Sequence, residues 1–143
     1  LGWCGAWFGF GHLSLQLVLG YLFAPLAFLL GVPWNEATIA GGFIGEKLVL
    51  NEFVAYVDFA AYLDPVQAAA KGVTVLSAHT QVIVTFALCG FANLSSIGII
   101  LGGLGVMAPS RRQDLARMGL RAVAAGTLSN LMRAALAGVF ISL

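Results

Sequence analysis

The fold of this chain is decided around residues 45–56, which read GEKLVLNEFVAY. This stretch holds two carboxylates, a lysine and an asparagine inside a segment that is otherwise long and apolar enough to cross a bilayer. Ionisable side chains at membrane depth are costly and are kept where they serve a function. Glu52 and its neighbours Lys47 and Asn51 are therefore candidate functional residues.

A second irregularity lies at residues 87–96, which read ALCGFANLSS. Small and hydrogen-bonding residues interrupt another long apolar run there. Such interruptions are tolerated in a membrane protein where the backbone is covered by protein or lines a cavity. The two irregular stretches together predict a polar binding site built at membrane depth.

Composition sets the class of protein. Of the 143 residues, 60% are hydrophobic and 9% are charged, and the mean hydropathy is +0.96. A soluble domain has about 25% charged residues, so the chain is predicted to be an all-α integral membrane protein. The net charge of +1 is too small to indicate a nucleic-acid partner, because phosphate binding needs a basic surface.

The first part of the chain divides into two predicted segments. Residues 1–10 are apolar but too short to span, and we expect them to be the end of a truncated transmembrane helix. Residues 11–34 predict a transmembrane helix, because the run from Leu13 to Leu30 would give about 27 Å of helix. Pro33 and Trp34 mark its end at an interface.

The polar motif lies in a helix predicted at 38–63. Helical spacing would place Gly41 and Gly45 on the same face as Glu52, so a neighbouring helix could approach closely beside that carboxylate. Asp64 and Pro65 end the helix. Residues 64–79 are too polar to span and predict an interfacial segment.

Residues 80–108 predict a re-entrant hairpin. Two apolar arms flank a centre rich in Gly, Asn and Ser, and each arm would cover only half of the bilayer. The alternative is a continuous helix with a soft centre. A last transmembrane helix is predicted at 113–143.

Basic residues predict the orientation. The hairpin would bring Lys71 to the same side as the arginine cluster Arg111, Arg112, Arg117 and Arg121. Positive charge gathers on the cytoplasmic side, so that side should be cytoplasmic and the C-terminus extracytoplasmic.

At these two motifs the sequence resembles the concentrative nucleoside transporters, a family of cation-coupled nucleoside symporters. The family's Asn-Glu-Phe motif and its flanking positions are matched by Gly45, Lys47, Asn51, Glu52, Phe53, Ala55 and Tyr56. Residues 87–96 resemble the family's second hairpin, and residues 20–28 (GYLFAPLAF) resemble its long scaffold helix. The resemblance covers essentially the whole chain.

The resemblance implies a homotrimer in the plasma membrane, with a transport domain of two inverted halves that bind substrate between hairpin tips. Within it, residues 11–34 would be the scaffold helix and 35–143 the C-terminal half of the transport domain, with 38–63 as a discontinuous helix. The coupling ion, sodium or a proton, would be bound in an N-terminal half that precedes this chain. No cofactor or metal site is therefore expected in this segment.

The resemblance also implies roles for single residues. Glu52 would accept a hydrogen bond from a ribose hydroxyl, Asn93 would bridge ribose hydroxyls, Ser96 would reach the hydroxymethyl end and Phe91 would pack beside the substrate. Asn51, Lys47 and Ser95 would support them. Judged from the residues alone, Glu52 could instead pair with a charge on another helix, and Asn93 could be a turn residue.

Other functions are weighed against the same residues. A channel lined by Glu52, or a secondary transporter of another small solute, is the alternative to nucleoside symport. An enzyme is not expected, because Cys89, Ser95, Ser96 and His79 form no recognisable triad or metal motif. Glu46 lies on another face than Glu52, and Asp58 is interpreted as a structural hydrogen-bonding group.

Overall fold

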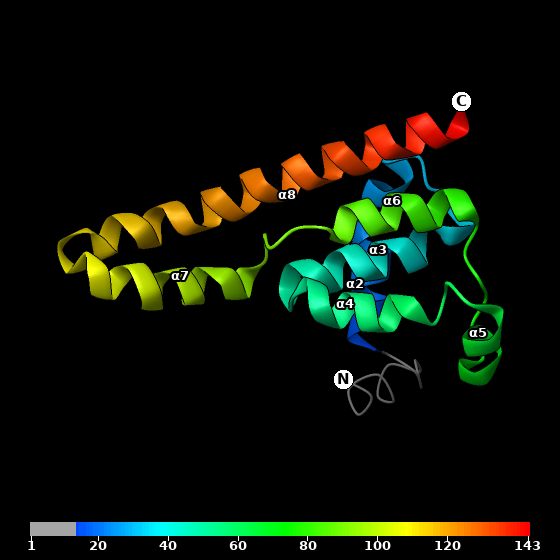
Figure 1. The fold of residues 1–143 in the computed structure, drawn as a ribbon, viewed down its shortest axis with the longest axis horizontal. Helices are drawn as coiled ribbons and strands as arrows, with labels where there is room; N and C mark the ends of the chain where they lie inside the picture. The colour runs from blue at the N-terminus through cyan, green and yellow to red at the C-terminus, as the bar shows by residue number, and fades with distance from the viewer. Residues whose placement is uncertain (1–13) are drawn as a thin grey trace.

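A computed structural model describes residues 14–143 (Figure 1). Its regular elements are all helical: α2 (Leu15–Leu29), α3 (Trp34–Val49), α4 (Glu52–Ala60), α5 (Pro65–Lys71), α6 (Ala78–Leu88), α7 (Leu94–Met107), the 3₁₀ helix η1 (Pro109–Arg111) and α8 (Arg112–Ser142). The all-α prediction is confirmed for the described residues. The helix end predicted at 1–10 lies outside them.

Most of these helices begin directly after a polar residue that caps their N-terminus. In each case an oxygen of the residue before the helix accepts a hydrogen bond from a backbone N–H of the first turn, which has no partner within the helix. These capping residues are Ser14, Asn51, Asp64, Ser77 and Asn93. The chain is therefore broken into short helices where the sequence supplies caps, as at Asn51 and Asn93.

Helices α2 and α3 pack closely because glycines face the contact. A Cβ atom built on Gly41 would lie 2.7 Å from backbone atoms of Phe23 and Ala24, and one on Gly45 would lie 2.8 Å from Leu19. The small-residue face predicted beside Glu52 is therefore turned toward α2. The predicted groove beside Glu52 is wrong, because α3 ends before residue 50 and Glu52 belongs to the next helix, α4.

Helices α3 and α4 form a hairpin, which corrects the single discontinuous helix predicted at 38–63. The Phe43 ring lies 5.4 Å from the Phe59 ring and 5.1 Å from the Tyr62 ring, measured between centroids. In a helix continuing past residue 50, positions 43 and 59 would be about 24 Å apart. The chain therefore folds back at the two-residue tip Leu50–Asn51 (Figure 1).

Helices α6 and α7 lie end to end, which corrects the hairpin predicted at 80–108. Residues 89–93, between the two helices, are called the α6–α7 break. Four positions along α6, this break and α7 contact α8 in the reverse of their chain order: Ile83 contacts Gly138, Gly90 contacts Asn130, Ala92 contacts Gly126 and Ile97 contacts Gly119. Gly119 and Gly138 are nineteen positions apart on α8, so the two outer contacts are about 28 Å apart along the helix. A hairpin would have brought them side by side. The 31-residue α8 instead runs along both helices (Figure 1).

This arrangement also corrects the argument for orientation. Because α6 and α7 run on in one direction, α5, which ends at Lys71, and the arginine cluster at the start of α8 lie at opposite ends of the molecule (Figure 1).

The element boundaries differ by a few residues from those predicted: α2 ends at Leu29, α3 begins at Trp34, and the segment predicted as interfacial contains α5 and an extended stretch before α6.

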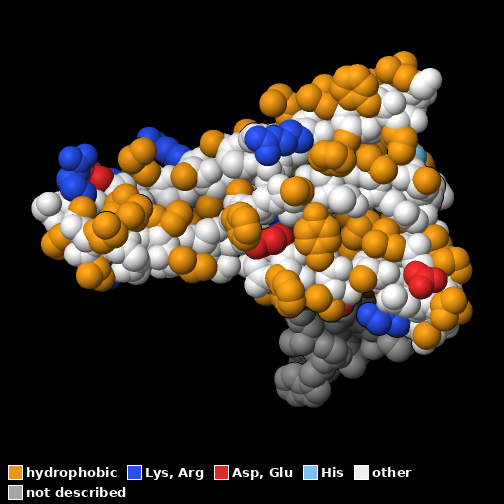
Figure 2. Space-filling model, in the orientation of Figure 1, with side chains coloured by type: hydrophobic (Ala, Val, Ile, Leu, Met, Phe, Trp, Pro, Cys, Tyr) orange, Lys and Arg blue, Asp and Glu red, His pale blue; other side chains and the backbone are white. Residues whose placement is uncertain are grey.

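The surface is rich in apolar side chains (Figure 2). Large hydrophobic residues are exposed along α7 and α8, among them Ile99, Val106, Leu128 and Phe140. Among the described residues, the stretch Pro109–Ser142 is long and apolar enough to cross a membrane, and α2 with α3 passes the same test as a pair bent by 115°.

Candidate functional site

The hairpin tip and the α6–α7 break, 40 residues apart in sequence, meet in the fold. At the tip, Asn51 caps α4 with its Oδ1, which accepts from Val54 N at 3.0 Å. The cap fixes the start of α4 and places Glu52 in its first turn. Asn51 thus holds the tip by capping α4, while the carboxylate of Glu52 faces the break.

The break is organised by a reciprocal cap. Asn93 Oδ1 accepts from Ser96 N at 2.8 Å, and Asn93 N donates to Ser96 Oγ at 3.2 Å. Ser96 Oγ also lies 2.7 Å from the Phe91 carbonyl oxygen, to which it can donate. The Ser96 side chain is therefore engaged within the break.

Two hydrogen bonds join the break to the tip. Asn93 Nδ2 donates to Glu52 Oε2 at 2.9 Å, and Ser95 Oγ donates to the Leu50 carbonyl oxygen at 2.9 Å. Asn93 is only 4% exposed, whereas Glu52 is half-buried. The structure thus brings Glu52 directly to Asn93 and gives Ser95 a connecting role.

The carboxyl group of Glu52 lies where two helices begin. Its carboxylate lies at the N-terminus of α4 and bonds to the residue that caps the N-terminus of α7, and both helix ends carry partial positive charge. Lys47, only 2% exposed, lies near this carboxyl group. The site therefore offers a hydrogen-bond acceptor held between two helix ends.

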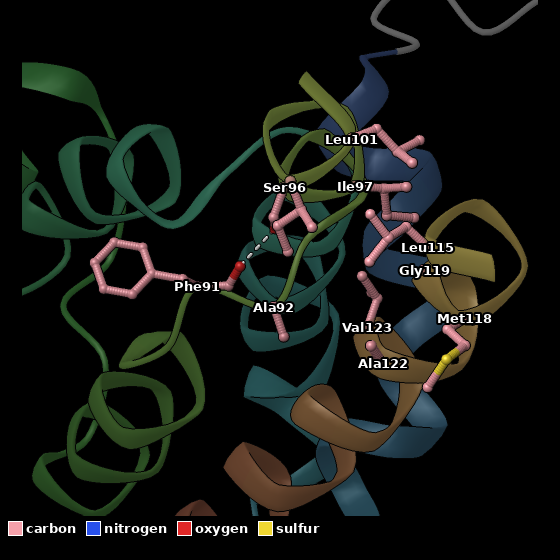
Figure 3. Close-up of a pocket in the computed structure, with 11 residues that line it drawn as sticks. Phe91, Ala92, Ser96, Ile97, Leu101, Leu115, Met118, Gly119, Ala122 and Val123 are labelled. Atoms are coloured by element: carbon pink, nitrogen blue, oxygen red, sulfur yellow. Dashed lines mark hydrogen bonds between the residues drawn. The ribbon is translucent and has the colours of Figure 1, made fainter. Parts of the chain in front are cut away.

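Phe91 borders an apolar cavity but its ring does not fill it. The cavity, about 300 Å³, lies between α7 and α8 and is lined by Phe91, Ala92, Ser96, Ile97, Ile100, Leu101, Leu115, Met118, Gly119, Ala122 and Val123. Figure 3 shows the Phe91 ring pointing away from the other lining side chains. The ring is 80% exposed, so its aromatic face is accessible beside the polar groups of the tip and the break.

One residue that positions the break was not singled out from the sequence. A Cβ atom on Gly90 would overlap Asn130 Nδ2, so the buried Asn130 side chain of α8 packs directly on the break. The available signal was a lone asparagine inside the apolar run of the last helix, where polar groups are costly. The Leu50 carbonyl oxygen is a backbone atom, so nothing in the sequence marks its part in the site.

The chemistry of this arrangement is hydrogen bonding. Glu52 accepts, the Asn93 amide donates and accepts, and serine hydroxyls do both. No group of three or more His, Cys, Asp or Glu side chains within residues 14–143 could hold a metal ion. The site suits an uncharged ligand that carries several hydroxyl groups.

The fold is helical with long apolar helices, and comparison with known proteins identifies its family. A family model described as "Na+ dependent nucleoside transporter C-terminus" matches residues 1–138. The chain belongs to this family, the concentrative nucleoside transporters, and corresponds to the C-terminal part of its members.

Relatives and a solved structure agree with this assignment. An uncharacterized transporter of Haemophilus influenzae is 59% identical over 140 residues, which are 97% of this chain and 32% of the relative. The nucleoside permease NupC of Helicobacter pylori is 52% identical over 92% of this chain and 30% of its own length. CNTnw, solved in an inward-facing substrate-bound state, is 56% identical with a TM-score of 0.90, covering 99% of this chain and 33% of that protein. The chain thus spans about a third of the length of these relatives, which are transporters.

Proposed function

We propose that this chain is the ribose-binding part of a cation-coupled nucleoside symporter. A protein of the relatives' length that contains this chain is called the full-length transporter below. The observation that carries the proposal is the 2.9 Å hydrogen bond between Asn93 Nδ2 and Glu52 Oε2. Without ligand, the Asn93 amide donates its hydrogen bond to the Glu52 carboxylate.

A pair of neighbouring ribose hydroxyls can replace this bond without loss. One hydroxyl donates to the Glu52 carboxylate while the other accepts from the Asn93 amide, because a hydroxyl does both. The free ring of Phe91 offers an apolar face for the sugar or the base. Ser96 would turn its hydroxyl from the Phe91 carbonyl toward the hydroxymethyl end of the substrate.

Three residues support this arrangement in the proposal. Asn51 holds the start of α4, Ser95 ties the break to the tip through the Leu50 carbonyl, and Lys47 attracts the Glu52 carboxylate by its charge. None of the three needs to touch the substrate.

The remaining parts of the proposal concern the whole transporter. Sodium is proposed as the coupling ion in keeping with the name of the matching family, with a proton as the alternative, bound N-terminal to this chain. The transporter would be a homotrimer in the plasma membrane with two inverted halves. A channel, or a secondary transporter of another small solute, is the competing function; flux that does not saturate with nucleoside would favour the channel.

Glu52→Gln in the full-length transporter tests the proposed site. The amide keeps the shape of the carboxyl but removes the charge that strengthens a ribose hydrogen bond. Such a bond contributes about 1.5–3 kcal/mol, so uridine should bind roughly 10- to 150-fold more weakly by calorimetry. Wild-type affinity in this variant would remove Glu52 from the site.

A matched ligand gives the control for this experiment. 2′,3′-Dideoxyuridine lacks the two ribose hydroxyls, so it should bind the wild type poorly and should lose little further affinity in Glu52→Gln. An equal loss for both ligands would show that the substitution acts on the fold and not on ribose recognition.

The hairpin and the broken helix also predict a membrane topology. Helix α3 is about 24 Å long and α4 about 14 Å, so neither arm crosses a hydrocarbon core of about 30 Å. We propose that α3 and α4 are re-entrant, that α6 and α7 cross as one broken span, and that α8 returns. The arginine cluster would then be cytoplasmic and the C-terminus extracytoplasmic.

Single cysteines test this topology. In a full-length transporter without Cys4 and Cys89, Gln67→Cys should react with a membrane-impermeant thiol reagent from outside the cell and Ser110→Cys only after the membrane is opened. Both positions are exposed. Labelling of both from the same face would contradict the broken span.

A further inference from the structure

A further hydrogen bond links the α3–α4 hairpin to α6, on the other side of the break from Asn93. Tyr56 Oη donates to the Thr85 carbonyl oxygen at 2.8 Å. Tyr56 lies in α4, one turn after Glu52, so the two side chains extend from the same face of that helix. Thr85 lies in the last turn of α6, shortly before the break. The face of α4 that carries Glu52 is therefore also tied to α6.

The Thr85 carbonyl oxygen can accept this bond because α6 ends there. In a helix that continued, the amide of Cys89 would donate to this oxygen. Here Cys89 N donates to the Phe86 carbonyl oxygen instead, at 3.3 Å. The last carbonyl groups of a helix lack partners within it, and Tyr56 supplies a partner from another helix. The Thr85 hydroxyl is engaged separately, since it donates to the Gln81 carbonyl oxygen at 2.7 Å.

The hairpin is thus attached on both sides of the break. On the α7 side, Asn93 and Ser95 make the two bonds to the tip. On the α6 side, the attachment is the Tyr56 hydroxyl. Phe91 lies in the chain between the two attachments. The position of Glu52 relative to the break therefore depends on both of them.

The two attachments differ in what a bound substrate would do to them. In the proposed function, ribose hydroxyls replace the bond between Asn93 and Glu52, so the tip loses one of its links to α7. The Tyr56 hydroxyl bonds to a backbone carbonyl of α6, for which the ribose does not compete. This bond would therefore still hold α4 against the broken helix when substrate is present.

We propose that Tyr56 is a positioning residue for nucleoside binding, which holds Glu52 at the distance from the break that a ribose requires. This inference rests on the proposed function and adds to it a residue that does not touch the substrate. Loss of the Tyr56 hydroxyl leaves the Glu52 carboxylate and the Asn93 amide chemically intact, but it lets α4 shift relative to α6. Neighbouring ribose hydroxyls then no longer meet both groups in one geometry, and affinity falls.

Tyr56→Phe in the full-length transporter tests this role, because it removes the hydroxyl and keeps the ring. By calorimetry, uridine should bind roughly 2- to 12-fold more weakly, the range expected for one neutral hydrogen bond. 2′,3′-Dideoxyuridine lacks the two hydroxyls that Tyr56 helps to place, so its affinity should not change. Tyr21→Phe, the same substitution on an exposed ring of α2, should alter neither affinity.

Two results of this experiment would overturn the positioning role. Wild-type uridine affinity in Tyr56→Phe would show that the hydroxyl is not needed to place Glu52. An equal loss of affinity for uridine and for the dideoxynucleoside would show that Tyr56 supports the fold and not ribose recognition.

Hydrogen exchange measured by mass spectrometry tests the bond itself without nucleoside. Backbone amides of residues 85–93 should exchange faster in Tyr56→Phe than in the wild type, while those of α2 should exchange at the same rate. Unchanged exchange at 85–93 would show that the hydroxyl does not hold α4 to α6. If Glu52→Gln binds uridine like the wild type, the proposed function fails, and the exchange result still decides whether Tyr56 joins the two helices.

Discussion

Replacing Asn93 with alanine should weaken nucleoside binding by the full-length transporter. The side chain caps α7 and also donates to Glu52. Loss of a cap costs about 1 kcal/mol, and a neutral hydrogen bond such as the one from the Asn93 amide to a ribose hydroxyl contributes about 0.5–1.5 kcal/mol. Together these predict a loss of uridine affinity of roughly 10- to 70-fold.

Two further substitutions separate the roles of Asn93. Asn93→Ser retains a capping oxygen but loses the amide donor, so it should keep more of the wild-type thermal stability than Asn93→Ala and still lose affinity. Asn93→Asp also retains a cap, but it places a second carboxylate against Glu52 and should bind uridine more weakly than Asn93→Ser. Wild-type affinity of Asn93→Ser in calorimetry would show that the amide is not part of the site.

Gly41→Ala should destabilise the core of the chain, although alanine is a better helix former than glycine. The added methyl group would lie 2.7 Å from backbone atoms of α2, which cannot rotate away. Overpacking of this kind costs about 1–3 kcal/mol, and it would separate α2 from α3. The melting temperature of the full-length transporter should fall accordingly.

Gly98→Ala is the matched control for this prediction. Gly98 also lies inside a helix, but nothing is within 4 Å of the position that its Cβ would take. Helix propensity alone then predicts stabilisation by about 0.5–1 kcal/mol. Equal melting temperatures for the two variants would argue against a tight α2–α3 contact at Gly41.

Much of the site could be predicted because its signals are local. Asn51 and Asn93 precede segments with helical periodicity, and the structure uses both as caps. Glu52 and Asn93 stand out as polar residues in apolar runs, and they are joined directly. The contact of Asn130 with Gly90 was harder to predict, because it depends on the register between α8 and a break 40 residues earlier.

The amino-acid sequence by itself determined where the helices are interrupted and which side chains cap the helices that follow. A capping residue bonds to a backbone N–H only three residues later, so this choice is local. It did not determine the direction of the chain after each break, since a two-residue tip and a five-residue linker can both turn back or run on. Tertiary packing decided between these outcomes. After residue 50 the chain turns back because α4 buries Phe59 against Phe43 of α3. After residue 88 it runs on because the 31 residues of α8 give α6 and α7 one continuous surface to cover.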